Sequence, residues 1–374
     1  MITFSEVRAS AGEVHGTIHV DGQSFEVWFK VTGARVEATA EAFTAMALPV
    51  AMSKGLAIEA PGPLDAGFRR NLDAWQEVLA TWYPDRLAPV EIVAGSRRPK
   101  KQSRGRACFF TGGIDSFFSA LRHLDSIEAL VFVHGFDVPL VELPDLRVAV
   151  TTGTRAAAEE LGKPLVEIET NLHDFSDAMA SPWGTTYHGA ALAGVAHLLV
   201  QSFCEILIGG THTYSDLFPW GSHPISDPLF SGDRLRVIHD GCDADRVEKT
   251  IAVAASDVAL RHLRVCWENR DGTYNCGQCR KCIRTQIALK IAGRLEACET
   301  LPDTIDLDEV RSMPLGDVNT IARHAELVHH LRASGTEPEL LEACEDDLRR
   351  HDPATTRWGT RDWTSVLPLL WERP

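Results

Sequence analysis

The first part of the chain alternates apolar and polar positions in two short runs. VHGTIHV and SFEVWFKV follow the period of two that is typical of strands. Asp21-Gly22-Gln23 separates the two runs and is typical of a tight hairpin turn. A helical pattern follows at 63–82, and PVEIVA then predicts a short strand. We therefore expect residues 1–96 to form a small N-terminal α+β accessory domain.

The middle of the chain alternates apolar runs with helical patterns. ACFFTG, ALVFVHGF, PLVEIET and EILIGGT have the length and composition of buried strands, and a helical pattern follows each of the first three. This alternation predicts an α/β fold, a doubly wound parallel sheet with helices on both faces, over 107–295. Residues 296–374 are mostly helical and polar, so we expect a helical C-terminal extension there.

A basic stretch joins the first two regions. Residues 97–106, RRPKKQSRGR, carry six basic residues in ten. A solvated linker is the plainer interpretation, and a basic lip for a phosphate-bearing ligand or nucleic acid is the alternative. The formal net charge of the whole chain is -15, which argues against non-specific binding of nucleic acid.

The composition also bears on the compartment. MITFSEVRAS has no basic segment followed by an apolar run, so no signal peptide is expected. The longest apolar stretch, near 189–200, is shorter than the roughly 20 residues that a membrane span needs. Four of the nine cysteines crowd into 266–282, which in a reducing compartment indicates a metal site rather than disulfides. We expect a cytoplasmic protein with no membrane partner.

The segment FFTGGIDSF is the first candidate site. It links a predicted strand to a predicted helix, where a doubly wound sheet binds ligands. Two glycines permit close backbone approach to an anion, and N–H groups at a helix start favour phosphate oxygens. A sharp turn with an Asp or Ser cap is the structural alternative. The candidate nucleotide-binding residues are Phe110, Thr111, Gly112, Gly113, Asp115 and Ser116.

TGGIDS resembles the SGGxDS signature of the PP-loop ATP pyrophosphatases, with Thr111 in place of the usual serine. The chain contains neither a Walker loop nor a G-x-G-x-x-G turn. The resemblance implies cleavage of ATP between its α and β phosphates, which yields a substrate adenylate and pyrophosphate. Asp115 would repel phosphate on its own, so its presence indicates a Mg²⁺ bridge or bonds to backbone amides.

The second candidate site is CWENRDGTYNCGQCRKC. Four thiolates close a tetrahedral zinc site, and C-x2-C spacing presents two sulfurs to one metal. An iron–sulfur cluster is the alternative. The metal ligands we expect are Cys266, Cys276, Cys279 and Cys282; the other cysteines, Cys108, Cys204, Cys242, Cys298 and Cys344, are expected to be buried apolar residues.

The two motifs together are similar to those of 7-cyano-7-deazaguanine synthase, over about 107–295. That family converts 7-carboxy-7-deazaguanine and ammonia to a nitrile through an amide, using ATP at each step. Its cysteine spacing has x8 where this chain has x9. The resemblance implies ATP, Mg²⁺ and structural Zn²⁺ as cofactors, and we also expect a homodimer.

Further residues are candidates by their position. ILIGGTHTYSDLFPWGSHPISDP follows a strand and matches the place of the family's ligand loop, although a polar surface loop or a metal site are alternatives. Lys249, beside Arg246 on a predicted helix, resembles the family's lysine near the ATP phosphates; an exposed helix lysine is the alternative. We expect Gly135 and Gly210 to contact ATP, and His188, His212, Asp216, His223 and Asp227 to include the substrate residues.

The leading hypothesis is an ATP-dependent ligase that forms a C–N bond, with Asp115, Ser116 and Lys249 as catalytic residues. It adenylates a small carboxylate, and ammonia or an amine then displaces AMP. A second hypothesis, suggested by similar proteins in anti-phage systems, joins the acid to a protein or other large amine. Modification of tRNA and a non-catalytic nucleotide sensor are the remaining alternatives.

Overall fold

The computed structural model describes residues 1–98, 105–316 and 318–351. These residues form two compact units: Met1–Thr111 with Asp115–Asp245, and Gly112–Ile114 with the chain from Arg246 onward. This division differs from the one expected at 96 and 295. Strands of the N-terminal segment belong to the sheet of the middle segment, and the residues from Arg246 onward group with the C-terminal helices. Most of the basic stretch, 99–104, and the tail after 351 lie outside the described residues.

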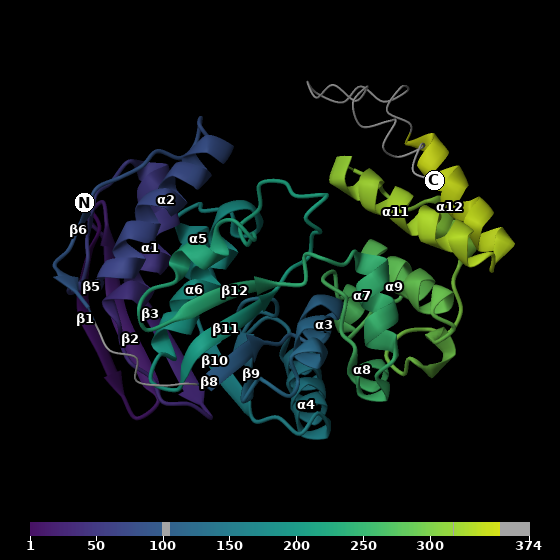
Figure 1. Cartoon of the computed structure of the whole chain (residues 1–374), viewed down its shortest axis with the longest axis horizontal. Coiled ribbons are helices and arrows are strands. Elements are labelled where there is room, and N and C mark those ends of the chain that lie inside the picture. Colours follow the sequence, from purple (N-terminus) through teal and green to yellow (C-terminus); the bar gives the residue numbers. More distant parts are fainter. Residues whose placement is uncertain (99–104, 317, 352–374) are drawn as a thin grey trace. The chain divides into compact units, whose positions relative to one another are not determined.

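One eight-stranded sheet organises the first unit (Figure 1). Its order is β1-β2-β3-β10-β9-β8-β11-β12. The strands from β10 to β12 run parallel, and β1 to β3 add antiparallel at the β10 edge. The strands are β1 (Thr3–Ser10), β2 (Glu13–Val20), β3 (Gln23–Thr32), β8 (Gly105–Phe109), β9 (Ala129–His134), β10 (Leu165–Thr170), β11 (Phe203–Gly209) and β12 (Arg236–Asp240), with short pairs β4 (Ile58–Glu59) and β6 (Ile92–Val93), and β5 (Leu64–Asp65) and β7 (Ser96–Arg97).

The parallel strands reverse their order at β8. The chain moves from β8 to β9 and β10 on one side, then returns to place β11 and β12 on the other. A largely parallel α/β sheet is thereby confirmed, and β8 and β11 flank its switch point. The helices of this unit are α1 (Ala40–Lys54), α2 (Ala66–Trp82), α3 (Ile114–Arg122), α4 (Pro144–Glu160), α5 (Leu172–Ala178) and α6 (His188–Leu198), with short turns Trp183–Tyr187 and Asp227–Phe230.

Apolar side chains bury both faces of the parallel strands. Phe109, Val131 and Ile206 share a core cluster with residues of α1 and α6. Leu130 and Leu207 alternate with them, are also buried, and so occupy the opposite face. That face carries α3 and α4, which connect consecutive parallel strands and by right-handed crossover share one side of the sheet.

The N-terminal hairpin is confirmed. Asp21 and Gly22 have φ of 49° and 77°, as a two-residue turn with left-handed central residues requires. The third strand of this segment then pairs with the main sheet, with Thr32 opposite Glu167. The basic residue Arg97, at the start of the stretch expected to be a linker, pairs with Glu41 of α1 at 2.8 Å.

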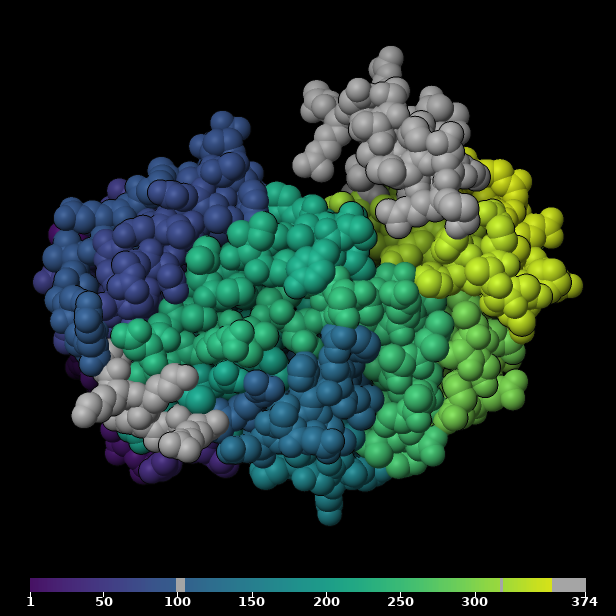
Figure 2. All heavy atoms as spheres, viewed as in Figure 1, coloured from purple at the N-terminus to yellow at the C-terminus, as the bar shows by residue number. Residues whose placement is uncertain are grey.

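The second unit consists of helices around a separate apolar core. In the space-filling view its last helix is yellow at the surface (Figure 2). No described helix of the protein is long and apolar enough to cross a membrane. The helices are α7 (Arg246–Ala254), α8 (Asp257–His262), α9 (Arg280–Ile291), α10 (Leu307–Arg311), α11 (Val318–Ser334) and α12 (Pro338–Arg350), with single turns Arg270–Gly272 and Leu295–Ala297.

Candidate functional site

The TGGIDS segment lies where β8 ends and α3 begins. The Thr111 N–H donates to the Ser116 hydroxyl at 3.2 Å, and this bond joins the start of the turn to the first turn of α3. Gly112 has φ of 76°, a conformation that a glycine adopts without strain. Thr111, Gly113 and Asp115 keep partial exposure, so the turn is accessible rather than sealed in the core.

The end of β11 meets this turn. A Cβ at Gly209 would lie 2.8 Å from the Asp115 carbonyl oxygen, so only glycine permits this approach. The Thr211 hydroxyl donates to the Asp115 carboxylate at 3.0 Å. Two segments that are about 95 residues apart in the sequence thus meet at the carboxyl ends of neighbouring parallel strands. Thr211, which sequence reasoning missed, lies in the predicted Gly-Gly-Thr turn.

Gly135 and Gly210, both predicted to contact ATP, lie where close packing leaves no room for a side chain. A Cβ at Gly135 would lie 2.2 Å from the Thr170 carbonyl oxygen, and its φ is 92°. A Cβ at Gly210 would lie 2.6 Å from Nε2 of His239. Both positions therefore require glycine for the fold, whatever ligand they meet.

A buried Asp–His pair anchors the segment between β11 and β12. Asp227 is fully buried, and its Oδ2 lies 2.8 Å from Nδ1 of His239 and 2.6 Å from the Ser222 hydroxyl. Its other oxygen accepts from the His223 N–H at 3.1 Å. Burial alone would lower the pKa of His239, but hydrogen bonds to Asp227 and Cys242 raise it to about 9. Asp227, predicted as a substrate residue, is in the structure an internal anchor of this segment.

The other predicted substrate residues are dispersed along the same unit. His212 is buried, with its ring edge-to-face against Phe218 at 4.3 Å. Asp216 is partly exposed in the turn that follows. Nδ1 of His188 lies 3.1 Å from the Trp183 carbonyl oxygen, and burial lowers its pKa. Among the described residues none of these histidines and aspartates joins a potential metal-binding group.

A pocket of about 310 Å³ opens beside β12. The segment between β11 and β12 forms more than half of its wall, with apolar side chains that include Leu217 and Ile225. Arg236 and His239 add polar groups from the strand. This combination of apolar walls and a few polar groups is typical of small-molecule sites.

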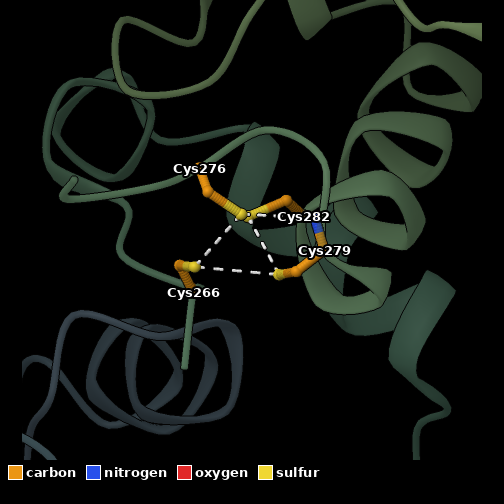
Figure 3. Close-up of side chains that lie close together, drawn as sticks. All are labelled: Cys266, Cys276, Cys279 and Cys282. Carbon is orange, nitrogen blue, oxygen red and sulfur yellow. Dashed lines mark hydrogen bonds between the residues drawn. The ribbon is translucent and has the colours of Figure 1, made fainter. Parts of the chain in front are cut away.

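The four predicted cysteines converge in the second unit (Figure 3). Their sulfurs all lie within 4.8 Å of one another, with neighbouring pairs at 3.4 to 3.7 Å. Zinc–sulfur bonds of about 2.3 Å put tetrahedral sulfurs roughly 3.8 Å apart, and a disulfide needs about 2 Å. These distances therefore fit a metal ion such as zinc, and the sulfurs are too far apart to be joined in disulfides. The other five cysteines are buried, as predicted.

Local backbone geometry holds the cysteine cluster. Cys279 precedes α9 and Cys282 lies in its first turn, so one helix start presents two sulfurs. The Cys279 N–H donates to the Cys276 sulfur at 3.2 Å. Hydrogen bonds from Cys282 and from the backbone outweigh burial and lower the pKa of Cys279, which favours the thiolate that a metal requires. A Cβ at Gly277 would lie 2.8 Å from Pro302, so the turn between these cysteines needs glycine.

The side chain of Asn275 fixes the backbone at Cys266 through hydrogen bonds. Its oxygen accepts from the N–H groups of Val265 and Cys266 at 2.9 and 3.1 Å. Its amide donates to the carbonyl oxygens of Leu263 and Thr300 at 2.9 and 3.0 Å. All four of these bonds fix backbone, so the cluster is preorganised by its own unit.

Lys249 belongs to the second unit, in α7. Its side chain is fully buried, which excludes the interpretation of an ordinary exposed helix lysine. Burying an ammonium group is costly unless neighbouring groups compensate its charge, so a charged Lys249 needs partners inside the unit. Arg246 opens the same helix and is partly exposed.

Comparison with known proteins gives no match to any family model, curated protein or solved structure. The likeness to PP-loop ATP pyrophosphatases is therefore a likeness of motifs. The geometry of the two candidate sites carries the functional argument.

Proposed function

We propose that this protein is an ATP-dependent ligase of the PP-loop pyrophosphatase type, which adenylates a small carboxylate and then forms a C–N bond. One observation carries the proposal: the TGGIDS turn and the turn after β11 meet at the switch point of the sheet, with Thr211 bonded to Asp115. Open α/β sheets bind nucleotides at such points.

The residues of the turn suit a nucleotide's phosphates. Gly112 and Gly113 leave room for oxygens to approach the backbone, and the start of α3 favours negative charge. Thr111 and Ser116 supply hydroxyl groups beside the same backbone. The Asp115 carboxylate is the group that would hold Mg²⁺, which supplies charge neutralisation for the phosphates when bound.

The proposed reaction has two steps. A carboxylate oxygen of the substrate attacks the α-phosphorus, a P–O bond forms, and the bond to the β-phosphate oxygen breaks. Pyrophosphate leaves, and the buried ammonium of Lys249 is our candidate for stabilising its charge. The nitrogen of ammonia or an amine then attacks the acyl carbon, AMP departs, and the nitrogen loses its extra proton.

The cysteine cluster takes no part in these steps in our proposal. Four thiolates fill a tetrahedral coordination sphere and leave no open position for substrate. A metal there would stabilise the segment from Cys266 to the start of α9. The pocket beside β12 is the candidate for the acid's ring, and a 7-carboxy-7-deazaguanine-like acid is the substrate we favour.

The test measures pyrophosphate release from ATP with 7-carboxy-7-deazaguanine, with simple carboxylates, and without acid. We expect release to depend on one of the acids and Asp115→Asn to lower it by about 100-fold or more. Asp145→Asn, an exposed carboxylate in the first turn of α4, is the matched control. Acid-dependent release that Asp115→Asn leaves unchanged would refute the assignment.

Ammonia and larger amines are separated in the same assay. Mass spectrometry of the product with ammonium, and of proteins incubated with the enzyme, ATP and the acid, identifies the nitrogen donor. ATP binding without turnover for every acid tested would favour the sensor.

A further inference from the structure

Arg264 lies beside the glycine turn within the second unit. Its N–H donates to the Gly112 carbonyl oxygen at 2.8 Å, and a Cβ placed on Gly112 would lie 3.8 Å from the Cβ of Arg264. The turn conformation at Gly112 and the position of Arg264 are therefore set together. Sequence reasoning missed this residue, because a lone arginine before a cysteine motif carries no pattern of its own.

The guanidinium group of Arg264 is buried and poorly satisfied. Only 6% of the residue is exposed. One of its terminal nitrogens donates to the Asn269 side-chain oxygen at 3.3 Å, a long bond, and Nε has no hydrogen-bond acceptor among the described residues. Buried arginines normally use several of their five N–H donors, because an unsatisfied buried donor destabilises the fold. The backbone and Cβ of Arg264 lie beside the Gly112 turn, so an anion bound at that turn is a candidate acceptor for the side chain's unused donors.

The cysteine cluster orients Arg264 through Asn269. The Asn269 N–H donates to the Cys266 sulfur at 3.2 Å, and Asn269 has φ of 45°, a left-handed conformation that asparagine tolerates. Its side-chain amide also donates to the Thr273 carbonyl oxygen at 3.0 Å. A continuous chain of bonds therefore runs from the first cysteine to Asn269 and on to the guanidinium group.

We propose that Arg264 is a phosphate-binding residue of the nucleotide site, positioned by the metal-binding knuckle through Asn269. The guanidinium group donates to phosphate oxygens held at the Gly112 turn, a geometry that its planar fork of donors suits. This inference rests on the proposed function, since it takes the turn to be the phosphate site. The competing role is neutralisation of the thiolate cluster's negative charge.

The experiment measures binding of ATP and of inorganic pyrophosphate by calorimetry, and zinc content by mass spectrometry on the same samples. We expect Arg264→Gln to lower the affinity for both ligands by about 10- to 100-fold while zinc content stays unchanged. Arg264→Lys should recover only part of the affinity, because an ammonium lacks the fork. Arg270→Gln removes an exposed cation of the same segment, and should bind as the wild type does.

Asn269 is tested as a positioning residue. Asn269→Gly keeps the left-handed backbone and its N–H but removes the side chain, so zinc content should stay unchanged. We expect it to weaken pyrophosphate binding in the wild-type background and to have little further effect in Arg264→Gln. Additive effects of the two substitutions would overturn the positioning role.

Two results would overturn the role of Arg264. Unchanged affinity for pyrophosphate in Arg264→Gln excludes it as a phosphate ligand, and loss of zinc that Arg264→Lys restores assigns it to charge balance. In both cases acid-dependent pyrophosphate release by the wild type still supports the proposed function. A wild-type protein that binds neither ATP nor pyrophosphate refutes both proposals.

Discussion

The buried pair of Asp227 and His239 makes the sharpest prediction about stability. Their side chains are 1% and 4% exposed and their atoms lie 2.8 Å apart. A pKa of about 9 for His239, against an ordinary value of about 6.5, corresponds to roughly 3 kcal/mol of preference for the protonated ring in the fold. This stabilisation is complete below about pH 6.5 and is lost as the pH rises through 9.

Asp227→Asn removes the charge that sustains this preference. Burial of the ring then lowers the pKa of His239 while Cys242 still raises it, so we expect the pKa to fall from about 9 to the ordinary value or below it. At pH 6 the segment between β11 and β12 should lose about 3 kcal/mol, since the variant leaves a buried partner unpaired. Its stability should then no longer decline between pH 6.5 and 9. Asp233→Asn, an exposed carboxylate of the same segment, is the control.

Two measurements check this prediction. Nuclear magnetic resonance follows the ring of His239, assigned with His239→Gln, from pH 5 to 10. Hydrogen exchange of the amides in 221–231 gives the free energy of local opening at pH 6 and pH 9. A wild-type ring that titrates near 6.5, or an Asp227→Asn variant that keeps the wild-type pH dependence, would refute the reasoning.

Two further predictions concern packing and metal. Gly135→Ala should lower the free energy of unfolding by about 2 kcal/mol or more, because its φ is 92° and the new methyl group would meet the Thr170 carbonyl oxygen. Gly22→Ala is the control, since Gly22 is also left-handed but a Cβ there would have no atom within 4 Å. In urea unfolding it should cost only about 1 kcal/mol. Cys276→Ser should reduce bound zinc and the melting temperature, whereas Cys298→Ser, outside the cluster, should keep wild-type zinc content; equal zinc in both variants would contradict the assignment.

The sequence predicted those features that depend on neighbours along the chain. The parallel strands alternate with helices because their apolar runs and helical periods are local patterns, and the Asp21-Gly22 turn follows from the conformations these residues tolerate. The cysteine cluster was predictable for the same reason, since three of its ligands lie within seven residues, at 276–282. The sequence did not predict α1, because this helix is apolar on all sides and therefore has no amphipathic period.

Only the tertiary structure decided how distant segments combine. The N-terminal strands join the main sheet because β3 pairs with β10, and no local pattern encodes which edge a strand will choose. Asp227 was predicted to face a ligand, but partners from β12 and its own turn bury it. The candidate roles of Arg264 and Thr211 depend on contacts with the TGGIDS turn, which lies far away in the sequence. Chain topology creates such contacts, whereas periodicity and spacing report only what neighbouring residues prefer.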